Sequence, residues 1–177
     1  AELERPIGVN GAALMATSTP QDAFSLIGAR NRNRIINGDC RIDQRRAGAS
    51  AAATDGGYYL DRWQTILNAG AFSVQQNAGS VTPPPGFNYY IGATVTSAAG
   101  TTPPGGTSGI RYNIEGYSIS DLAWGTSSAK TVTLSFWVYS SLTGSFGGAI
   151  WNSAQSYSYP FLYNVPVANT WTYITIT

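Results

Sequence analysis

The sequence of 177 residues is long enough for one domain and an appendage, but only 11% of its residues are charged, where globular proteins average about 25%. Its 12% aromatic content excludes a disordered chain, because disorder accompanies high charge and few aromatic residues. The single cysteine, Cys40, excludes an internal disulfide and a cysteine-based zinc site, and the absence of histidine excludes Ser-His and Cys-His nucleophiles.

Residues 1–33 are predicted to form an N-terminal anchoring or linker arm. Residues 1–18 lack periodicity, which favours an extended linker. A short helix is predicted near 20–27, because Thr19 can cap it, Pro20 suits the first helical position and Gly28 ends the run. About two turns are too short to be stable alone in water, so we expect this helix to dock on another surface.

The charged residues are concentrated in the first third of the chain, which is rich in arginine. After Arg62 the charged residues are only Arg111, Glu115, Asp121 and Lys130. A net charge of +1 and so neutral a surface favour self-association, because charge keeps small domains apart. The sequence therefore predicts an oligomer.

Residues 34–177 are predicted to form an all-β domain, an antiparallel β-sandwich of the jelly-roll type. Short apolar runs alternate with Gly, Pro, Ser and Thr, and no alternation of strands with helices appears. A short turn or helix fits 118–123. The last predicted strand reaches Thr177, so we expect the domain to be truncated there and the sequence to be a fragment. Strands are predicted at 34–37, 40–45, 58–67, 71–77, 87–95, 109–116, 130–140, 145–152, 157–163 and 170–177.

The first two predicted strands carry a distinctive pattern around an Asn37-Gly38 turn. Beyond the turn, strand alternation would place Cys40, Ile42 and Gln44 on one face and a row of alternating charges on the other. We expect the charged side chains to form structural or intersubunit ion pairs. The residues predicted to take part are Arg41, Asp43, Arg45, Asp61 and Arg62.

Several segments, in this order and spacing, resemble the phage tail-fibre and receptor-binding protein family. They are Ile36-Asn37-Gly38, Ile42, Gln44-Arg45, Tyr58, Asp61-Arg62-Trp63, Ile114-Glu115-Gly116, Leu122-Ala123-Trp124-Gly125 and Thr133-Leu134-Ser135-Phe136-Trp137-Val138. Two positions depart from the pattern, because Cys40 and Asp43 stand where aromatic residues are usual. The resemblance implies a jelly-roll domain, similar to a carbohydrate-binding module, in a virion tail appendage. It also implies a homotrimer whose N-terminal arm attaches to other tail or baseplate proteins.

Catalytic residues, a metal site and a cofactor are not predicted. Glycan hydrolysis needs two carboxyl groups, one of them with a raised pKa. Glu115 and Asp121 near Trp124 are the only late candidates, and a structural role is favoured for both. Nucleic-acid binding is not expected either, since a net charge of +1 is far from the basic face such domains carry. No apolar run is long enough for membrane insertion.

A host surface glycan is the one ligand that the aromatic residues favour. Sugar sites on β-sandwiches use exposed aromatic faces beside amide and hydroxyl groups. We predict a recognition patch made of Trp151, Asn152, Tyr157 and Tyr159. Three functions stay open. The first is a structural and attachment protein of the virion, and the second is the carbohydrate-binding module of a glycan hydrolase whose catalytic part lies outside this sequence. The third and least favoured is a glycan hydrolase that uses Glu115 and Asp121.

Overall fold

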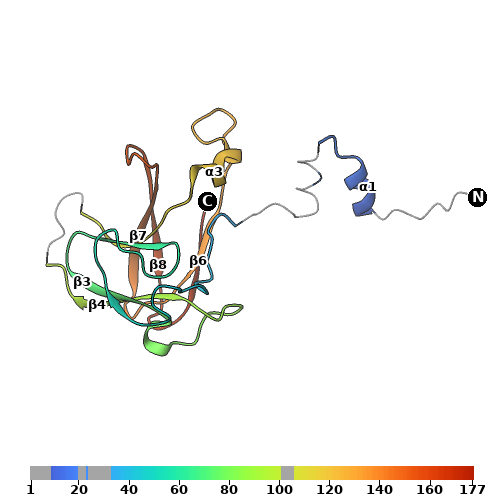
Figure 1. Cartoon of the computed structure of the whole chain (residues 1–177). Coiled ribbons are helices and arrows are strands. Elements are labelled where there is room, and N and C mark those ends of the chain that lie inside the picture. Colours follow the sequence, from blue (N-terminus) through green and yellow to red (C-terminus); the bar gives the residue numbers. More distant parts are fainter. Residues whose placement is uncertain (1–8, 20–22, 24–32, 101–105) are drawn as a thin grey trace, which may run out of the picture. The chain divides into compact units, whose positions relative to one another are not determined.

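The computed structural model describes residues 9–19, 23, 33–100 and 106–177 (Figure 1). The chain divides into two compact units, Ala1–Ile36 and Asn37–Thr177. Of the helix predicted near 20–27, only Ala23 belongs to the described residues, and the rest of that prediction lies outside them.

The first unit contains a short helix, α1 (Val9–Met15). The hydroxyl of Thr17 donates to the carbonyl of Leu14 (2.8 Å) and so satisfies one backbone acceptor at the helix C-terminus. The expectation of an extended linker over residues 1–18 is therefore wrong for Val9–Met15. An unbroken apolar stripe is missing there, and the residues that favour a helix are only the four at its C-terminal end, Ala12 to Met15. No helix among the described residues is long and apolar enough to cross a membrane.

The described part of the second unit is mostly β-strand, and every strand pairs antiparallel with a neighbour. One sheet has the order β1-β3-β4, and the remaining strands form the pairs β2-β5, β6-β9 and β7-β8 (Figure 1). The predicted all-β class is confirmed. The strands are β1 (Ala51–Ala52), β2 (Trp63–Leu67), β3 (Ala71–Gln76), β4 (Ile91–Ser97), β5 (Ser108–Tyr112), β6 (Leu134–Val138), β7 (Gly144–Trp151), β8 (Ser158–Val165) and β9 (Thr172–Ile176).

Short helical turns connect some of these strands. The helix α3 (Gly116–Ile119) runs into the 3-10 turn η2 (Ser120–Leu122), which confirms the short element predicted at 118–123. A further 3-10 turn, η1 (Ala78–Ser80), follows β3.

The strands predicted at 34–37 and 40–45 do not form, and the chain there consists largely of turns. Asn37 and Cys40 have left-handed φ values of 58° and 56°, which are incompatible with a continuous strand. The alternation of residue types along 40–45 therefore does not reflect a strand. Cys40 is buried in the core, whereas Arg41 and Ile42 are at least partly exposed.

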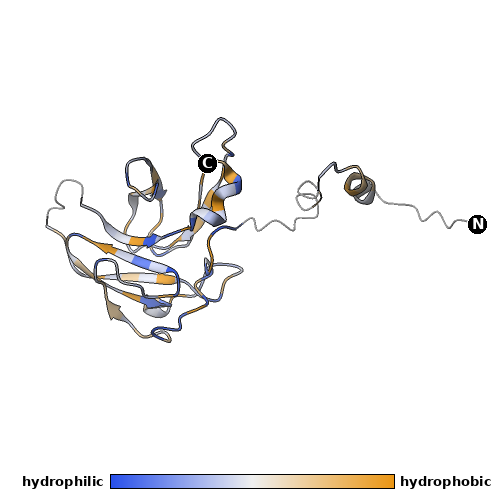
Figure 2. Cartoon of the chain, turned by 45° about the horizontal axis from the view of Figure 1, so that its top comes forward, coloured by the Kyte–Doolittle hydropathy of each residue, from blue (hydrophilic) through white to orange (hydrophobic). Residues whose placement is uncertain are grey.

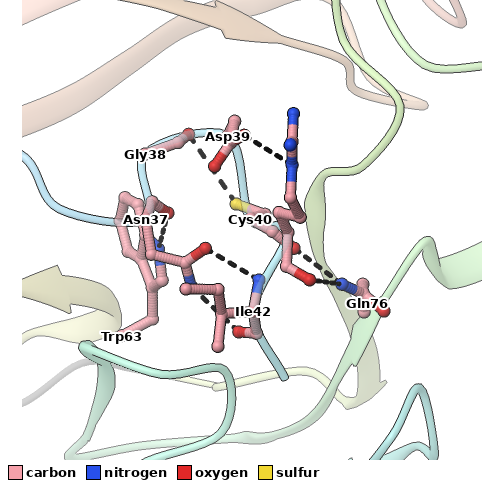
Figure 3. Close-up of polar contacts among 8 residues, drawn as sticks. Asn37, Gly38, Asp39, Cys40, Ile42, Trp63 and Gln76 are labelled. Carbon is pink, nitrogen blue, oxygen red and sulfur yellow. Dashed lines mark hydrogen bonds and ion pairs between the residues drawn. The ribbon is translucent and has the colours of Figure 1, made fainter. Parts of the chain in front are cut away.

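The side chain of Asn37 organises this turn region (Figure 3). Its amide nitrogen donates to the carbonyls of Ile42 and Asp61, both at 2.9 Å, and its amide oxygen accepts the backbone N–H of Ile42 at 2.9 Å. Its backbone carbonyl accepts the indole N–H of Trp63 (2.9 Å). One buried residue thus joins the turn to the start of β2. We call this arrangement the Asn37 clamp.

Two further side chains fasten the same turn region to the strands. Gln76, at the end of β3, donates from its amide to the carbonyls of Cys40 (2.7 Å) and Arg41 (3.2 Å) (Figure 3). The carboxylate of Asp61 accepts the backbone N–H of Gln44 (2.8 Å). The backbone groups of an irregular segment are in this way satisfied without a strand partner.

The main core lies between this turn region and the three-stranded sheet. Its buried members include Tyr59 and Leu60, which precede β2, and the alternate residues Phe72 and Val74 of β3. The hydroxyl of Tyr59 is buried as well, and it donates to the carbonyl of Ala52 (2.6 Å) while accepting the N–H of Thr54 (2.7 Å). The remaining buried members are Cys40 and Ala53.

The C-terminal half packs largely through aromatic side chains. Tyr163 of β8 contacts Phe136 of β6 edge-on, with ring centroids 5.3 Å apart, and stacks on Phe146 of β7 at 5.8 Å. Trp171 joins this half to the preceding segment, because its indole N–H donates to the carbonyl of Thr82 (2.8 Å) and its ring packs on Tyr90. Figure 2 shows hydrophilic and hydrophobic residues as blue and orange bands that follow one another along the same strands.

We expect Asn37→Gly to destabilise the second unit by about 2–4 kcal/mol, because it removes three side-chain hydrogen bonds worth about 0.5–1.5 kcal/mol each. Glycine adopts the left-handed backbone conformation without strain, so the loss of stability in Asn37→Gly reports the missing amide group alone. Asn37→Ala should destabilise the unit further, because alanine is strained in that conformation. Urea unfolding measures both. The exposed Asn164→Ala is the control, expected within about 0.5 kcal/mol of the parent. Equal effects of Asn37→Gly and Asn164→Ala would contradict the role of the clamp.

We expect the thiol of Cys40 to resist modification in the folded protein. Burial raises its pKa to about 12, so the thiol stays protonated at pH 8, and reactivity requires the thiolate. A chromogenic disulfide reagent at pH 8 should react only after urea unfolds the chain. Rapid labelling without urea would show that this part of the core is open.

Candidate functional site

The register of the β7-β8 hairpin positions the residues predicted to bind a glycan. Ile150 pairs with Tyr159, and the next pair is Trp151 with Ser158. Paired residues share a face and successive pairs alternate, so Trp151 and Tyr159 project to opposite sides of the hairpin. The predicted patch therefore does not form as one surface. Tyr157 and Tyr159 are well exposed, whereas Trp151 is half-buried.

Asn152 is occupied in holding the turn of the same hairpin. Its amide oxygen accepts the backbone N–H groups of Ser156 (2.9 Å) and Tyr157 (3.1 Å), and its amide nitrogen donates to the Ser156 hydroxyl (3.0 Å). A role in shaping the turn accounts for this residue type at this position. The structure thus assigns Asn152 to the loop backbone and leaves the tyrosines beside it exposed.

Tyr159 borders an apolar groove of about 250 Å³ where the ends of β6, β7, β8 and β9 meet, which we call the Trp124 groove. Two cross-strand pairs contribute to it, Leu134 with Ile176 and Ile150 with Tyr159. The indole N–H of Trp124 donates to the carbonyl of Lys130 (2.9 Å), so the ring is fixed while its faces stay partly exposed. The full lining is Trp124, Val132, Leu134, Ile150, Tyr159, Ile176 and Thr177.

The residues predicted to form ion pairs take different partners. Arg41 pairs with its neighbour Asp39 (3.2 Å) on the surface. Asp43 instead accepts the backbone N–H groups of Arg46 (3.1 Å) and Gly48 (2.7 Å). Arg45 lies over the ring of Tyr58, with its guanidinium carbon 5.7 Å from the ring centroid.

Asp61 also departs from the expectation of an arginine partner. Among the described residues its carboxylate holds the backbone N–H of Gln44, and its carbonyl is bound by the Asn37 clamp. These hydrogen bonds to backbone groups could not be predicted from local sequence patterns, because the residues that they join lie 17 and 24 positions apart. Asp61 is thus a structural acceptor inside the turn region.

Arg62, one of the residues predicted to form ion pairs, takes a distant partner that the sequence did not indicate. Its guanidinium pairs with Glu115, donates to the carbonyl of Asn113 (3.3 Å) and lies over the ring of Tyr112. The backbone of Arg62 has a left-handed φ of 77°, which is an unusual conformation for arginine. Tyr58, Arg62, Asn113, Ile114 and Glu115 line a shallow hollow of about 140 Å³ at this place.

The ion pair of Arg62 with Glu115 suits a structural role for this hollow. The hydrogen bond from Arg62 lowers the pKa of the Glu115 carboxyl below its ordinary value, so this group is ionised at neutral pH. A general acid for glycoside cleavage needs the opposite shift. No group of three or more potential metal-ligating residues occurs within residues 9–19, 33–100 and 106–177.

No protein-family model matches the sequence, and no match was found among curated proteins or solved structures. The resemblance to tail-fibre proteins therefore rests on the motifs in the sequence. In the structure, two of those motifs meet in the Asn37 clamp, and Glu115 of a third pairs with Arg62.

We expect the Arg62–Glu115 pair to stabilise the fold above pH ~4.3, the ordinary pKa of glutamate, and to lose its effect as the pH falls below it. The sign follows from the lowered pKa of Glu115, which favours the ionised form in the folded state. Glu115→Gln should lower the Tm slightly at pH 7 and leave it unchanged in strong acid. In an Arg62→Gln background the same substitution should have no effect at either pH. An equal Tm difference at both pH values in the parent background would refute the ion-pair role.

Proposed function

We propose that this chain is a non-catalytic structural and attachment module of a phage tail appendage, a tail fibre or receptor-binding protein located in the virion. The observation that carries the proposal is a C-terminal half with exposed apolar side chains and almost no charge. Between residues 117 and 173 the only charged residues are Asp121 and Lys130. Large exposed apolar side chains in that span are Tyr117, Trp124, Leu142, Tyr157, Tyr159, Leu162, Val167 and Tyr173.

Such a surface supports self-association. Leu162 on β8 is 75% exposed and Tyr157 is 79% exposed, in a region where no charge opposes contact with a second neutral surface. Exposed apolar side chains in a segment with so little charge are candidate sites of protein contact. A homotrimer, the arrangement implied by the resemblance, would cover this surface.

The proposed architecture is a two-layered jelly-roll sandwich. The alternation of burial along β7 and β8 supports two layers, because Phe146, Phe161 and Tyr163 are covered while their strand neighbours are exposed. The aromatic contact between Tyr163 and Phe136 joins the β7-β8 pair to the β6-β9 pair. In this proposal the N-terminal arm attaches the module to other tail or baseplate proteins.

The second candidate function is a carbohydrate-binding module of a glycan hydrolase whose catalytic part lies outside this sequence. It is favoured by the exposed tyrosines of the β7-β8 hairpin and by the half-exposed ring of Trp124. Against it, the Trp124 groove is lined almost wholly by apolar side chains, and a sugar also needs polar partners.

Light scattering on the purified chain tests the first proposal, and we expect three times the mass of one chain at micromolar concentration. Leu162→Lys should lower that mass, because it places a desolvated charge in the contact. Val95→Lys, at a comparably exposed residue on the three-stranded sheet, should leave the trimer intact. A monomeric parent protein, or equal effects of the two substitutions, would contradict self-association through the C-terminal half.

A further inference from the structure

The β6-β9 ribbon has a second face, opposite the one that packs on Tyr163. Strand alternation assigns Leu134, Phe136 and Ile174 to the covered face. The other face carries cross-strand pairs of a different kind, Ser135 with Thr175 and Trp137 with Tyr173. Ser135 and Thr175 are exposed, and Tyr173 is 55% exposed, so this face is open to solvent.

Aromatic rings form a row along this outer face. Trp137 and Tyr173 are 5.1 Å apart between ring centroids and tilted by 54°. Beyond them Tyr139 packs on Trp171 at 5.4 Å. Trp171 is in turn fixed by the carbonyl of Thr82, so the segment around Thr82 closes the row at one end.

Hydroxyl groups border the open end of the row. Ser135 and Thr175 form the pair next to Trp137 and Tyr173, and the hydroxyls of Thr133 and Thr177 lie 3.2 Å apart beyond them. No charged residue belongs to either strand. The face is therefore neutral, with flat apolar rings followed by groups that both donate and accept hydrogen bonds.

We propose that this outer face binds a neutral saccharide, with one pyranose ring on the exposed ring of Tyr173, beside Trp137, and the next residue against Ser135 and Thr175. The C–H face of a sugar ring is apolar and suits an aromatic ring, while its hydroxyls need hydroxyl or amide partners. Anionic glycans are disfavoured, because neither β6 nor β9 carries a cationic residue. The Trp124 groove, by contrast, is lined mostly by apolar side chains, and its hydroxyls are those of Tyr159 and Thr177.

This site deepens the attachment role proposed above and rests on it, but it does not depend on self-association. It also differs from the patch predicted on the β7-β8 hairpin. A shallow open face predicts weak binding per site, with Kd values of the millimolar order. Several copies in an oligomer would raise the apparent affinity.

The test is binding of the intact chain to an array of neutral oligosaccharides of glucose, galactose, mannose and N-acetylglucosamine. We expect at least one to bind and Tyr173→Ala to weaken that binding about tenfold. Tyr173→Phe should retain most of it, because the ring remains. Tyr117→Ala is the matched control, an exposed tyrosine on α3 outside both candidate glycan surfaces, and should bind like the parent. Tyr157→Ala tests the patch predicted on the β7-β8 hairpin.

Unfolding curves of the variants separate loss of binding from loss of fold. Tyr173 is 55% exposed and contacts Trp137, so we expect Tyr173→Ala to lower the Tm slightly while the protein stays folded at the temperature of the binding assay. Three results would overturn the proposal: no neutral oligosaccharide binds, Tyr157→Ala removes binding while Tyr173→Ala does not, or Tyr173→Ala lowers the oligomer mass without affecting any glycan. A monomeric parent that still loses glycan binding on Tyr173→Ala would refute self-association and leave this site standing.

Discussion

The amide of Asn37 satisfies backbone groups that no strand reaches. Residues 37–44 follow an irregular path against the core, and a buried irregular segment needs a hydrogen-bond partner for each of its polar groups. A single side chain with two donors and one acceptor meets this need for Ile42 and Asp61, while its carbonyl orients Trp63. The core below depends on that path, since it places Cys40 beside Phe72 and Val74. An aliphatic residue at position 37 has no groups with which to do the same.

Sequence patterns predicted strands correctly where the alternation of apolar and polar residues matches the burial of the strand. In β3, Phe72 and Val74 alternate with polar residues, and their burial follows that alternation. The strand prediction for the turn region was wrong for a physical reason. Cys40, Ile42 and Gln44 also alternate, but contacts to Asp61 and Gln76, distant in sequence, hold the chain in left-handed conformations that the local pattern does not reveal.

In the candidate sites, too, local features could be predicted from the sequence, whereas features that depend on strand pairing could not. Exposure of Tyr157 and Tyr159 was predictable from their place beside a polar loop. The separation of Trp151 from Tyr159 needed the exact pairing of β7 with β8, and a shift by one residue would have reversed it. The pairing of Trp137 with Tyr173 joins strands 36 positions apart, with a whole hairpin between them, and no spacing rule in the sequence specifies it. The distribution of charge, in contrast, can be read directly from the sequence, and β6, β7, β8 and β9 contain no charged residue.

The Asn37 clamp also has a mechanical consequence. Asn37 is the first residue of the second unit, so tension arriving along the chain from the N-terminal side enters the domain at this residue. Its hydrogen bonds reach Ile42, Asp61 and Trp63, so the residue that receives the pull is fastened to three places in the domain. The first strand, β1, begins only at Ala51, so force from the N-terminal side acts on the clamp before it reaches that strand.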